Sequence, residues 1–218
     1  MAARGLFGPS TLTLEGVHGW LTSFHTLVTE QKAYLTELDS AIGDADHGTN
    51  MSRGMDAVAA DEGGAAPAAI GPLLKSVGMT LVSTVGGASG PLYGTFFLRF
   101  AASAGESTEL DGNAVGAALR AALDGVVARG KASVGDKTMV DALAPAVEAW
   151  SDAIGNGASL ADAAAAARDA AHTGSDSTEP LVARRGRASY LGERSAGHLD
   201  PGSVSTTLLF TALAKALT

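Results

Sequence analysis

Three carboxylates and an imidazole lie close together in the chain, at Asp39, Asp44, Asp46 and His47. Carboxylates that fold against one another repel strongly unless a cation neutralises them, and hard divalent ions are the usual partners of oxygen ligands. An EF-hand calcium loop starting at Asp44 would need a glutamate where Met55 stands. Zinc is disfavoured because no cysteine or second histidine accompanies the carboxylates. The pattern therefore predicts a Mg²⁺ site, with a solvated acidic loop or a helix cap as the alternative.

Three other glycine-containing breaks in the chain offer groups that bind phosphate. Residues 86–90 provide unhindered backbone amides just before a helical segment, a plausible anion cradle. Residues 130–138 nearly spell a P-loop, but Asp136 stands directly before the lysine and no buried strand precedes the stretch, so a P-loop is rejected. Residues 186–202 place arginines in a loop of glycine and serine, which suits phosphate recognition. The alternative for these arginines is a solvated surface loop.

The elements that would position these breaks are helices, because apolar residues recur at three- and four-residue spacing and no stretch alternates as a strand does. The sequence predicts an all-α chain of eight or nine helices forming a single domain over residues 1–218. The expected helical stretches are 17–28, 34–38, 47–58, 73–82, 95–100, 115–127, 139–150, 161–171 and 203–217.

Several helix ends can also be placed. Gly43 should break the second helix, and the next should run from His47 to about residues 62–64. Ser159 with the acidic residue three positions later is typical of a capping pair. Residues 173–180 should form a polar loop, and Pro201 should occupy the first turn of the last helix.

Composition excludes several classes of protein. The chain has 15 basic and 23 acidic residues and a formal net charge of −8, which argues against a nucleic-acid or anionic-membrane surface. It contains no cysteine, so disulfides, thiolate metal sites and a cysteine nucleophile are excluded. No apolar run is long enough to span a bilayer, and the residues after Arg4 do not form a signal peptide. We therefore expect a cytoplasmic protein.

If the helices run up and down, loops at one rim converge on a single site. A metal held by the aspartates, together with amides and arginines from the other loops, would bind the phosphates of a nucleotide. No covalent catalyst stands out. His47 could accept a phosphoryl group, although a histidine beside carboxylates more often orients a ligand.

Four motifs, at residues 38–54, 85–97, 135–143 and 186–203, closely resemble the nucleotide-binding L subunit of dihydroxyacetone kinase. The resemblance spans nearly the whole chain, with the motifs in the same order. It implies an antiparallel eight-helix barrel, a closed up-and-down bundle with the nucleotide site in loops at one rim.

The resemblance also assigns site residues. It implies that Asp39, Asp44 and Asp46 bind Mg²⁺, as two ions. Arg187 would lie near the phosphates as a catalytic helper. The implied contacts to ADP or ATP are His47, Gly48, Thr49, Asn50, Ala88, Ser89, Gly130, Met139, Arg187, Asp200, Pro201 and Gly202.

Two branches of the family imply different partners. In one branch the domain follows a dihydroxyacetone-binding domain and uses exchangeable ATP. In the other it is a separate chain whose resident ADP is phosphorylated by a subunit of the phosphotransferase system. The phosphoryl group then passes to dihydroxyacetone on a K subunit. A free-standing chain resembles the second branch, and a homodimer is compatible with it. A kinase using free ATP, a non-catalytic Mg²⁺–nucleotide sensor and a phosphohistidine carrier at His47 stay as alternatives.

Overall fold

The computed structural model describes residues 9–61 and 67–218, and in this part of the chain nearly all regular structure is helical. The prediction of an all-α chain is confirmed. The elements, in chain order, are β1 (Leu12–Thr13), α1 (Leu14–Glu30), α2 (Lys32–Ile42), α3 (His47–Asp61), α4 (Ile70–Thr84), α5 (Ser89–Ala104), β2 (Glu109–Leu110), α6 (Gly112–Gly130), α7 (Val140–Gly155), α8 (Leu160–Asp176), the 3₁₀ segment η1 (Arg187–Ser195) and α9 (Pro201–Ala216).

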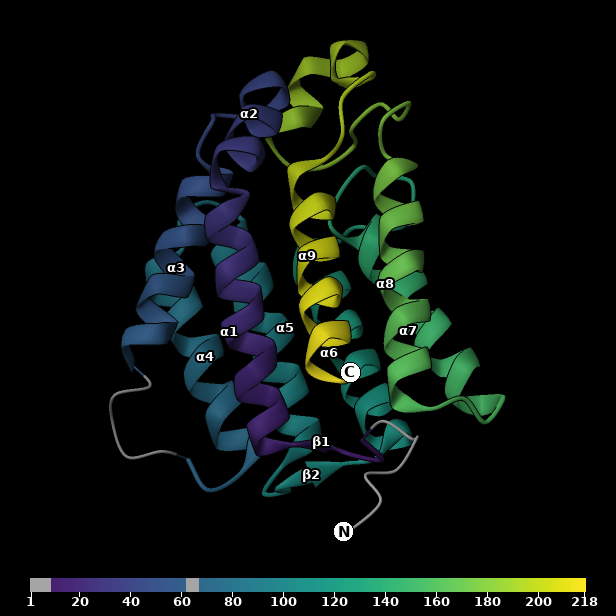
Figure 1. Ribbon diagram of the computed structural model, residues 1–218. Coiled ribbons are helices and arrows are strands. Elements are labelled where there is room, and N and C mark those ends of the chain that lie inside the picture. Colours follow the sequence, from purple (N-terminus) through teal and green to yellow (C-terminus); the bar gives the residue numbers. More distant parts are fainter. Residues whose placement is uncertain (1–8, 62–66) are drawn as a thin grey trace, which may run out of the picture.

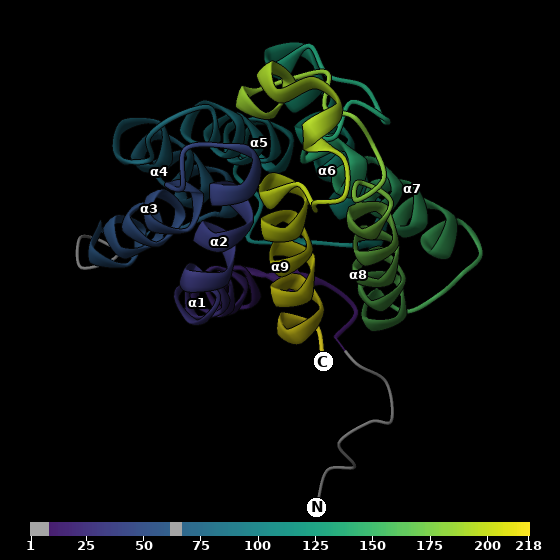
Figure 2. The ribbon, with the colours of Figure 1, turned by 90° about the horizontal axis from the view of Figure 1, so that it is seen from above.

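Long helices lie side by side and connect the two ends of the molecule (Figure 1). Each packs against its neighbours in the order α1, α3, α4, α5, α6, α7, α8, α9, and α9 packs against α1. Figure 1 shows α2 and the yellow-green η1 at one end of the long helices, and Figure 2 views the helices from that end. At the other end β1 and β2 pair antiparallel, with Leu12 opposite Leu110. Two-residue strands are too short to show alternation, so the sequence did not predict them.

Aromatic side chains fill the interior between α1 and α5. Trp20 packs against Phe96, Phe97 and Phe100 at ring-centroid distances of 6.4, 5.9 and 5.6 Å. Its indole N–H donates to the carbonyl of Leu209 on α9 at 2.9 Å, so the buried polar atom is satisfied. This core fixes the helices whose ends carry the polar loops. No helix in the described ranges is long and apolar enough to cross a membrane.

The helix ends follow from local sequence. Gly43 ends α2, and α3 begins at His47, as expected; the predicted end of that helix at residues 62–64 lies outside the described residues. The Ser159 side chain accepts a hydrogen bond from the Asp162 amide, which confirms the capping pair of α8. Pro201 occupies the first turn of α9, where its missing N–H costs nothing.

Two predicted breaks are wrong in extent. The polar loop expected at residues 173–180 is helical as far as Asp176, because Gly174 lets α8 approach α7 and Ser175 forms a buried hydrogen bond with Ser203 at 2.9 Å. The helix expected over residues 95–100 starts earlier and shortens the break before it, since α5 begins at Ser89. In both segments small or polar residues serve close helix packing rather than a loop.

Glycines bring α4 and α5 into close contact. A Cβ on Gly71 would lie 2.2 Å from the Gly105 carbonyl oxygen. A Cβ on Gly78 would lie 2.9 Å from the Gly94 carbonyl oxygen, and one on Gly94 would lie equally close to that of Gly78. These distances are shorter than any Cβ tolerates, so larger residues would force the two backbones apart. We call Gly71, Gly78 and Gly94 the glycine seam.

Candidate functional site

The acidic cluster is assembled by the turn between α2 and α3. One carboxylate oxygen from each of Asp39, Asp44 and Asp46 lies within 4.8 Å of the others. Asp39, in the last turn of α2, is buried, and its Oδ2 accepts hydrogen bonds from the amides of Asp46 and His47 at 2.8 and 3.1 Å. These bonds fix the carboxylate in place and stabilise its negative charge.

Gly43 makes room for this arrangement. A Cβ at Gly43 would lie 2.0 Å from Asp39 Oδ1. Ala45, two residues further on, takes a left-handed conformation with φ 61°. The turn can therefore fold back so that Asp44 and Asp46 face Asp39. A set made of oxygen donors alone, one of them buried and oriented by amides, fits Mg²⁺ rather than a softer ion.

His47 belongs to a hydrogen-bonded chain that runs from the cavity into the core. Its Nδ1 is 3.0 Å from Ser89 Oγ, and its Nε2 is 2.9 Å from Ser205 Oγ. Tyr93 continues the chain with a 2.7 Å hydrogen bond to Ser205. Burial lowers the pKa of His47 to about 4, and the nearby carboxylates of Asp39 and Asp46 offset this in part. His47 is therefore neutral at physiological pH, with both ring nitrogens engaged, which favours orienting a ligand over carrying a phosphoryl group.

Arg187 reaches the acidic cluster from the first residue of η1. Its Nε lies 3.0 Å from Asp44 Oδ2, and the two side chains are 66% and 35% exposed. The guanidinium keeps further N–H donors that can bind a phosphate. Gly186 precedes it with φ 65°, a conformation that glycine adopts without strain. Arg187 is thus held at the acidic cluster with most of its side chain exposed.

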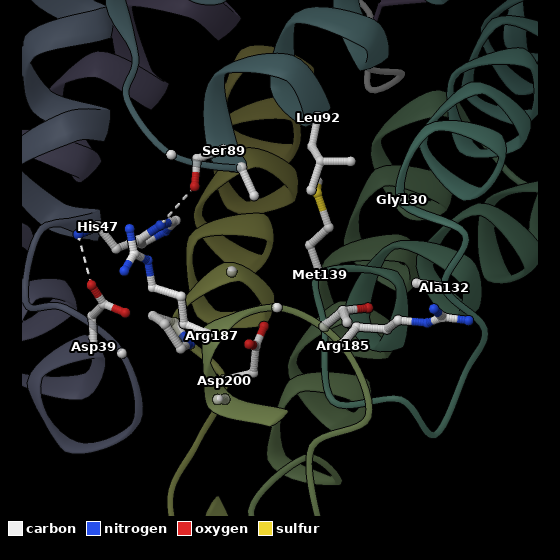
Figure 3. A pocket seen from close by; sticks show the side chains of 18 of the residues that line it. Asp39, His47, Ser89, Leu92, Gly130, Ala132, Met139, Arg185, Arg187 and Asp200 are labelled. Carbon is white, nitrogen blue, oxygen red and sulfur yellow. Dashed lines mark hydrogen bonds between the residues drawn. The ribbon is translucent and has the colours of Figure 1, made fainter. Parts of the chain in front are cut away.

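A cavity of about 440 Å³ extends from the acidic cluster to an apolar wall. Figure 3 shows Asp39, His47 and Ser89 on one side of it and Leu92 with Met139 on the other. Ala132 and Gly130 lie beyond them. One end is charged and the other apolar, so the cavity suits a molecule that joins phosphates to a flat ring system.

Asp200 lines the cavity and caps the N-terminus of α9. Its Oδ2 accepts a hydrogen bond from the Ser203 amide at 2.6 Å. Burial raises the pKa of the Asp200 carboxyl to about 7, the amide hydrogen bond opposes this, and the nearby Asp141 carboxylate adds to it. Asp200 is accordingly a further acid of the site, half-buried and separate from the cluster of three.

The structure brings most of the predicted site residues to one cavity, although their binding roles stay predictions. The cavity wall includes Asp39, Asp44, Asp46, His47, Ala88, Ser89, Gly130, Met139, Arg187, Asp200, Pro201 and Gly202. Gly48, Thr49 and Asn50 do not contribute to it. Gly48 instead lets α3 approach α2, since a Cβ there would lie 2.1 Å from the Lys32 carbonyl oxygen. Thr49 is exposed, and Asn50 accepts a hydrogen bond from Arg53 at 2.7 Å.

Sequence reasoning missed several residues of the site. Leu92 and Ala132 build the apolar wall, but an isolated apolar residue in a helix or turn carries no signal of ligand contact. Ser205 and Tyr93 orient His47 from positions far along the chain. Lys137 was considered only as part of a rejected P-loop, and the structure gives it a different place.

Known proteins share this chain's sequence and fold. The family described as DAK2 domain matches residues 41–215. The chain is 44% identical over 206 residues to the Escherichia coli protein named PEP-dependent dihydroxyacetone kinase, ADP-binding subunit DhaL, covering 94% of this chain and 98% of that protein. It is 42% identical to the Lactococcus lactis protein named PTS-dependent dihydroxyacetone kinase, ADP-binding subunit DhaL, covering 93% and 97%.

Larger kinases contain a similar region. L-erythrulose 1-kinase of Mycolicibacterium smegmatis is 36% identical, and the match covers 91% of this chain but 35% of that protein. The crystal structure of the dihydroxyacetone kinase of C. freundii superposes with a TM-score of 0.72 at 26% identity, covering 99% of this chain and 36% of that one. A second structure of the C. freundii kinase, in complex with AMP-PNP and Mg²⁺, gives a TM-score of 0.69.

Proposed function

Since this chain belongs to the DAK2 domain family, we propose that it is the ADP-binding subunit of a phosphoenolpyruvate-dependent dihydroxyacetone kinase. The observation that carries the proposal is the cavity itself, which ends in three carboxylates on one side and an apolar wall on the other. Such a cavity suits the phosphates and the adenine of a nucleotide. Higher identity to the ADP-binding subunits, 44%, than to the erythrulose kinase, 36%, favours resident ADP over exchangeable ATP.

The acidic end would hold the metal. Mg²⁺ bound by Asp39, Asp44 and Asp46, as a pair of ions, would bridge phosphate oxygens and neutralise charge during in-line transfer. The amides of Ala88 and Ser89 supply donors for the phosphates, because α5 begins there without a capping side chain.

The other residues of the cavity would orient the nucleotide. Arg187 is placed to turn further N–H groups towards the phosphates. Met139 and Gly130, with Leu92, would contact adenine and ribose. The pKa of His47 is lowered to about 4 and both of its ring nitrogens are hydrogen-bonded, so it would hold Ser89 in place and would be a poor base for the acceptor. A base for the dihydroxyacetone hydroxyl would therefore lie on the partner.

The proposal extends to the assembly. The resident ADP would be phosphorylated by a subunit of the phosphotransferase system, and the phosphoryl group would pass to dihydroxyacetone on a K subunit. The chain would act in the cytoplasm as one domain. The cyclic order of helix contacts from α1 through α9 and back to α1 supports a closed eight-helix barrel. The rim that carries the cavity would face both partners in turn.

A reconstituted assay tests the function. The purified chain is dialysed, its nucleotide content is measured, and K subunit, phosphoryl donor and phosphoenolpyruvate are added to follow dihydroxyacetone phosphate. We expect ADP to survive dialysis and Asp46→Asn to abolish transfer. Asp56→Asn is the matched control, because that side chain is 62% exposed on the outside of α3. Rapid exchange of bound ADP would favour the kinase that uses free ATP. Full transfer by Asp46→Asn would favour a sensor, and acid-labile label that survives ADP removal would favour a phosphohistidine.

A further inference from the structure

Lys137 is a buried lysine in the turn between α6 and α7, and its side chain is fully occupied by main-chain oxygens. The residue is 1% exposed. Its Nζ donates to the carbonyls of Thr178 at 2.7 Å and Glu179 at 3.3 Å, and also to the carbonyl of His198. An ammonium has three N–H donors, so these carbonyls use all of them. The hydrogen bonds offset the cost of burying the charge.

The three carbonyls belong to the two ends of one connection. Thr178 and Glu179 directly follow α8, and His198 stands just before α9. The same ends are joined by two more hydrogen bonds, from the Gly197 amide to the Glu179 carbonyl at 2.8 Å and from the Asp200 amide to Thr178 Oγ1 at 3.0 Å. A single ammonium thus fastens both ends of residues 177–200, which we call the α8–α9 connection.

The turn that carries Lys137 is itself rigidly built. The buried Asp141 carboxylate accepts hydrogen bonds from the amides of Gly135 and Thr138 at 2.5 and 2.7 Å. Lys137 takes a left-handed conformation with φ 62°, which a residue other than glycine keeps only where its surroundings hold it. The ammonium is therefore presented from a fixed base.

The α8–α9 connection supplies one side of the nucleotide cavity. Arg185, Arg187 and Asp200 all belong to it and contribute to the cavity wall. The Arg187 Nε lies 3.0 Å from Asp44 Oδ2, so the middle of the connection reaches the acidic cluster. Anything that loosens those ends would shift the arginine that meets the acidic cluster.

We propose that Lys137 is a positioning residue for phosphoryl transfer: by holding both ends of the α8–α9 connection through main-chain carbonyls, it places Arg187 and Asp200 around the nucleotide. The inference rests on the proposed function for the identity of the ligand. The attachment of both ends of the α8–α9 connection to Lys137 does not depend on which nucleotide binds. Burial lowers the pKa of the Lys137 ammonium, and the nearby carboxylates of Asp200, Glu179 and Asp141 oppose this in part.

A charge-specific rescue tests the proposal. The chain contains no cysteine, so Lys137→Cys introduces a single thiol. Alkylation of the unfolded variant with 2-bromoethylamine, followed by refolding, restores an ammonium at nearly the original reach. Alkylation with 1-iodopropane gives a neutral side chain with the same number of non-hydrogen atoms. Lys75→Cys, at an exposed position on α4, is carried through both treatments as the matched control, together with refolded wild type.

Two readouts separate positioning from general stability. For the propyl adduct we expect ADP affinity in Mg²⁺ to fall roughly 10- to 100-fold. Amide exchange should rise within residues 177–200, but not in α1 or α4. The aminoethyl adduct should restore both. Equal behaviour of the two adducts, or a uniform rise in exchange over all helices, would overturn the proposal.

Wild type provides a further test that needs no variant. Without nucleotide, the amides of Gly197 and Asp200 should exchange slowly, and rapid exchange there would also overturn the proposal. If wild type fails to bind ADP, the proposed function fails. The exchange patterns of the adducts then still decide the role of Lys137.

Discussion

Replacing Gly43 by alanine should disable the acidic cluster while leaving the helices in place. The added Cβ would lie 2.0 Å from Asp39 Oδ1 and 3.0 Å from the Asp39 carbonyl oxygen. Either the carboxylate rotates or the turn moves away. Both movements break the hydrogen bonds that Asp39 Oδ2 accepts from the amides of Asp46 and His47, now 2.8 and 3.1 Å long.

The size of the effect follows from those two bonds. Hydrogen bonds to a charged group contribute about 1.5–3 kcal/mol each. Part of this is regained as the freed carboxylate reaches water, and alanine stabilises by about 0.4–1 kcal/mol through the unfolded chain. We expect the free energy of unfolding to fall by about 2–4 kcal/mol, which lowers the Tm of a chain of this length by roughly 4–16 °C. Misplacing a metal ligand should weaken Mg²⁺ binding by a further factor of about 10–100.

Calorimetric titration of ADP in the presence of Mg²⁺, into protein freed of bound nucleotide by unfolding and refolding, combined with thermal unfolding, measures both effects. Gly155→Ala is the control, because a Cβ at the end of α7 meets nothing within 4 Å. It should raise Tm only slightly, by roughly 1–4 °C, and leave ADP affinity unchanged. Wild-type ADP affinity in Gly43→Ala would refute the reasoning, because Asp39 would then have no part in holding the metal, whatever happened to Tm.

Three further changes probe other parts of the site. The Tm of Asp200→Asn relative to that of wild type should rise between about pH 4 and pH 7. Burial raises the carboxyl pKa from 3.8 to about 7, so the folded wild type holds an extra proton in that window and loses stability as the pH rises. A Tm difference that stays constant across pH would contradict this. Arg187→Gln removes an exposed ion pair with Asp44, 3.0 Å long and contributing at most about 1 kcal/mol. Tm should therefore barely change, while titration calorimetry should show ADP affinity falling roughly tenfold or more; the reverse pattern would make Arg187 structural. Gly48→Ala puts a Cβ 2.1 Å from the Lys32 carbonyl oxygen and should cost about 1–3 kcal/mol in urea unfolding, so an unchanged midpoint would contradict a packing role.

The sequence predicted the acidic cluster well because its geometry is local. Asp39 lies in the last turn of a helix that Gly43 ends, and the turn from there to His47 is short. The three carboxylates must therefore lie close together. Helix periodicity placed the other elements for a similar reason, since it depends on neighbours within a few residues. Local rules therefore reached both the helices and the acidic side of the cavity.

Long-range contacts set the remainder, and no pattern along the chain encodes them. Leu92 on α5 and Met139, in the turn before α7, come together on the apolar side of the cavity. Lys137 binds main-chain carbonyls, so the side chains of the residues that accept its hydrogen bonds play no part in the contact. Every residue has a main-chain carbonyl, so the amino-acid sequence does not indicate which carbonyls accept hydrogen bonds from the Lys137 ammonium. Gly174 contributed to the wrong prediction of a loop, because a glycine in a polar segment is typical of loops. In the structure it allows two helices to approach closely.

The glycine seam between α4 and α5 has a consequence for anyone who maps the site by mutation. At Gly71, Gly78 and Gly94 every side chain would meet a backbone carbonyl or a packed side chain at 2.9 Å or less. A saturation scan scored by growth would therefore mark these positions as intolerant as Asp39, although none of them lines the nucleotide cavity. Intolerance at these three glycines would report on the spacing of two helices, and a scan would need a separate measure of folded protein to tell the seam from the site.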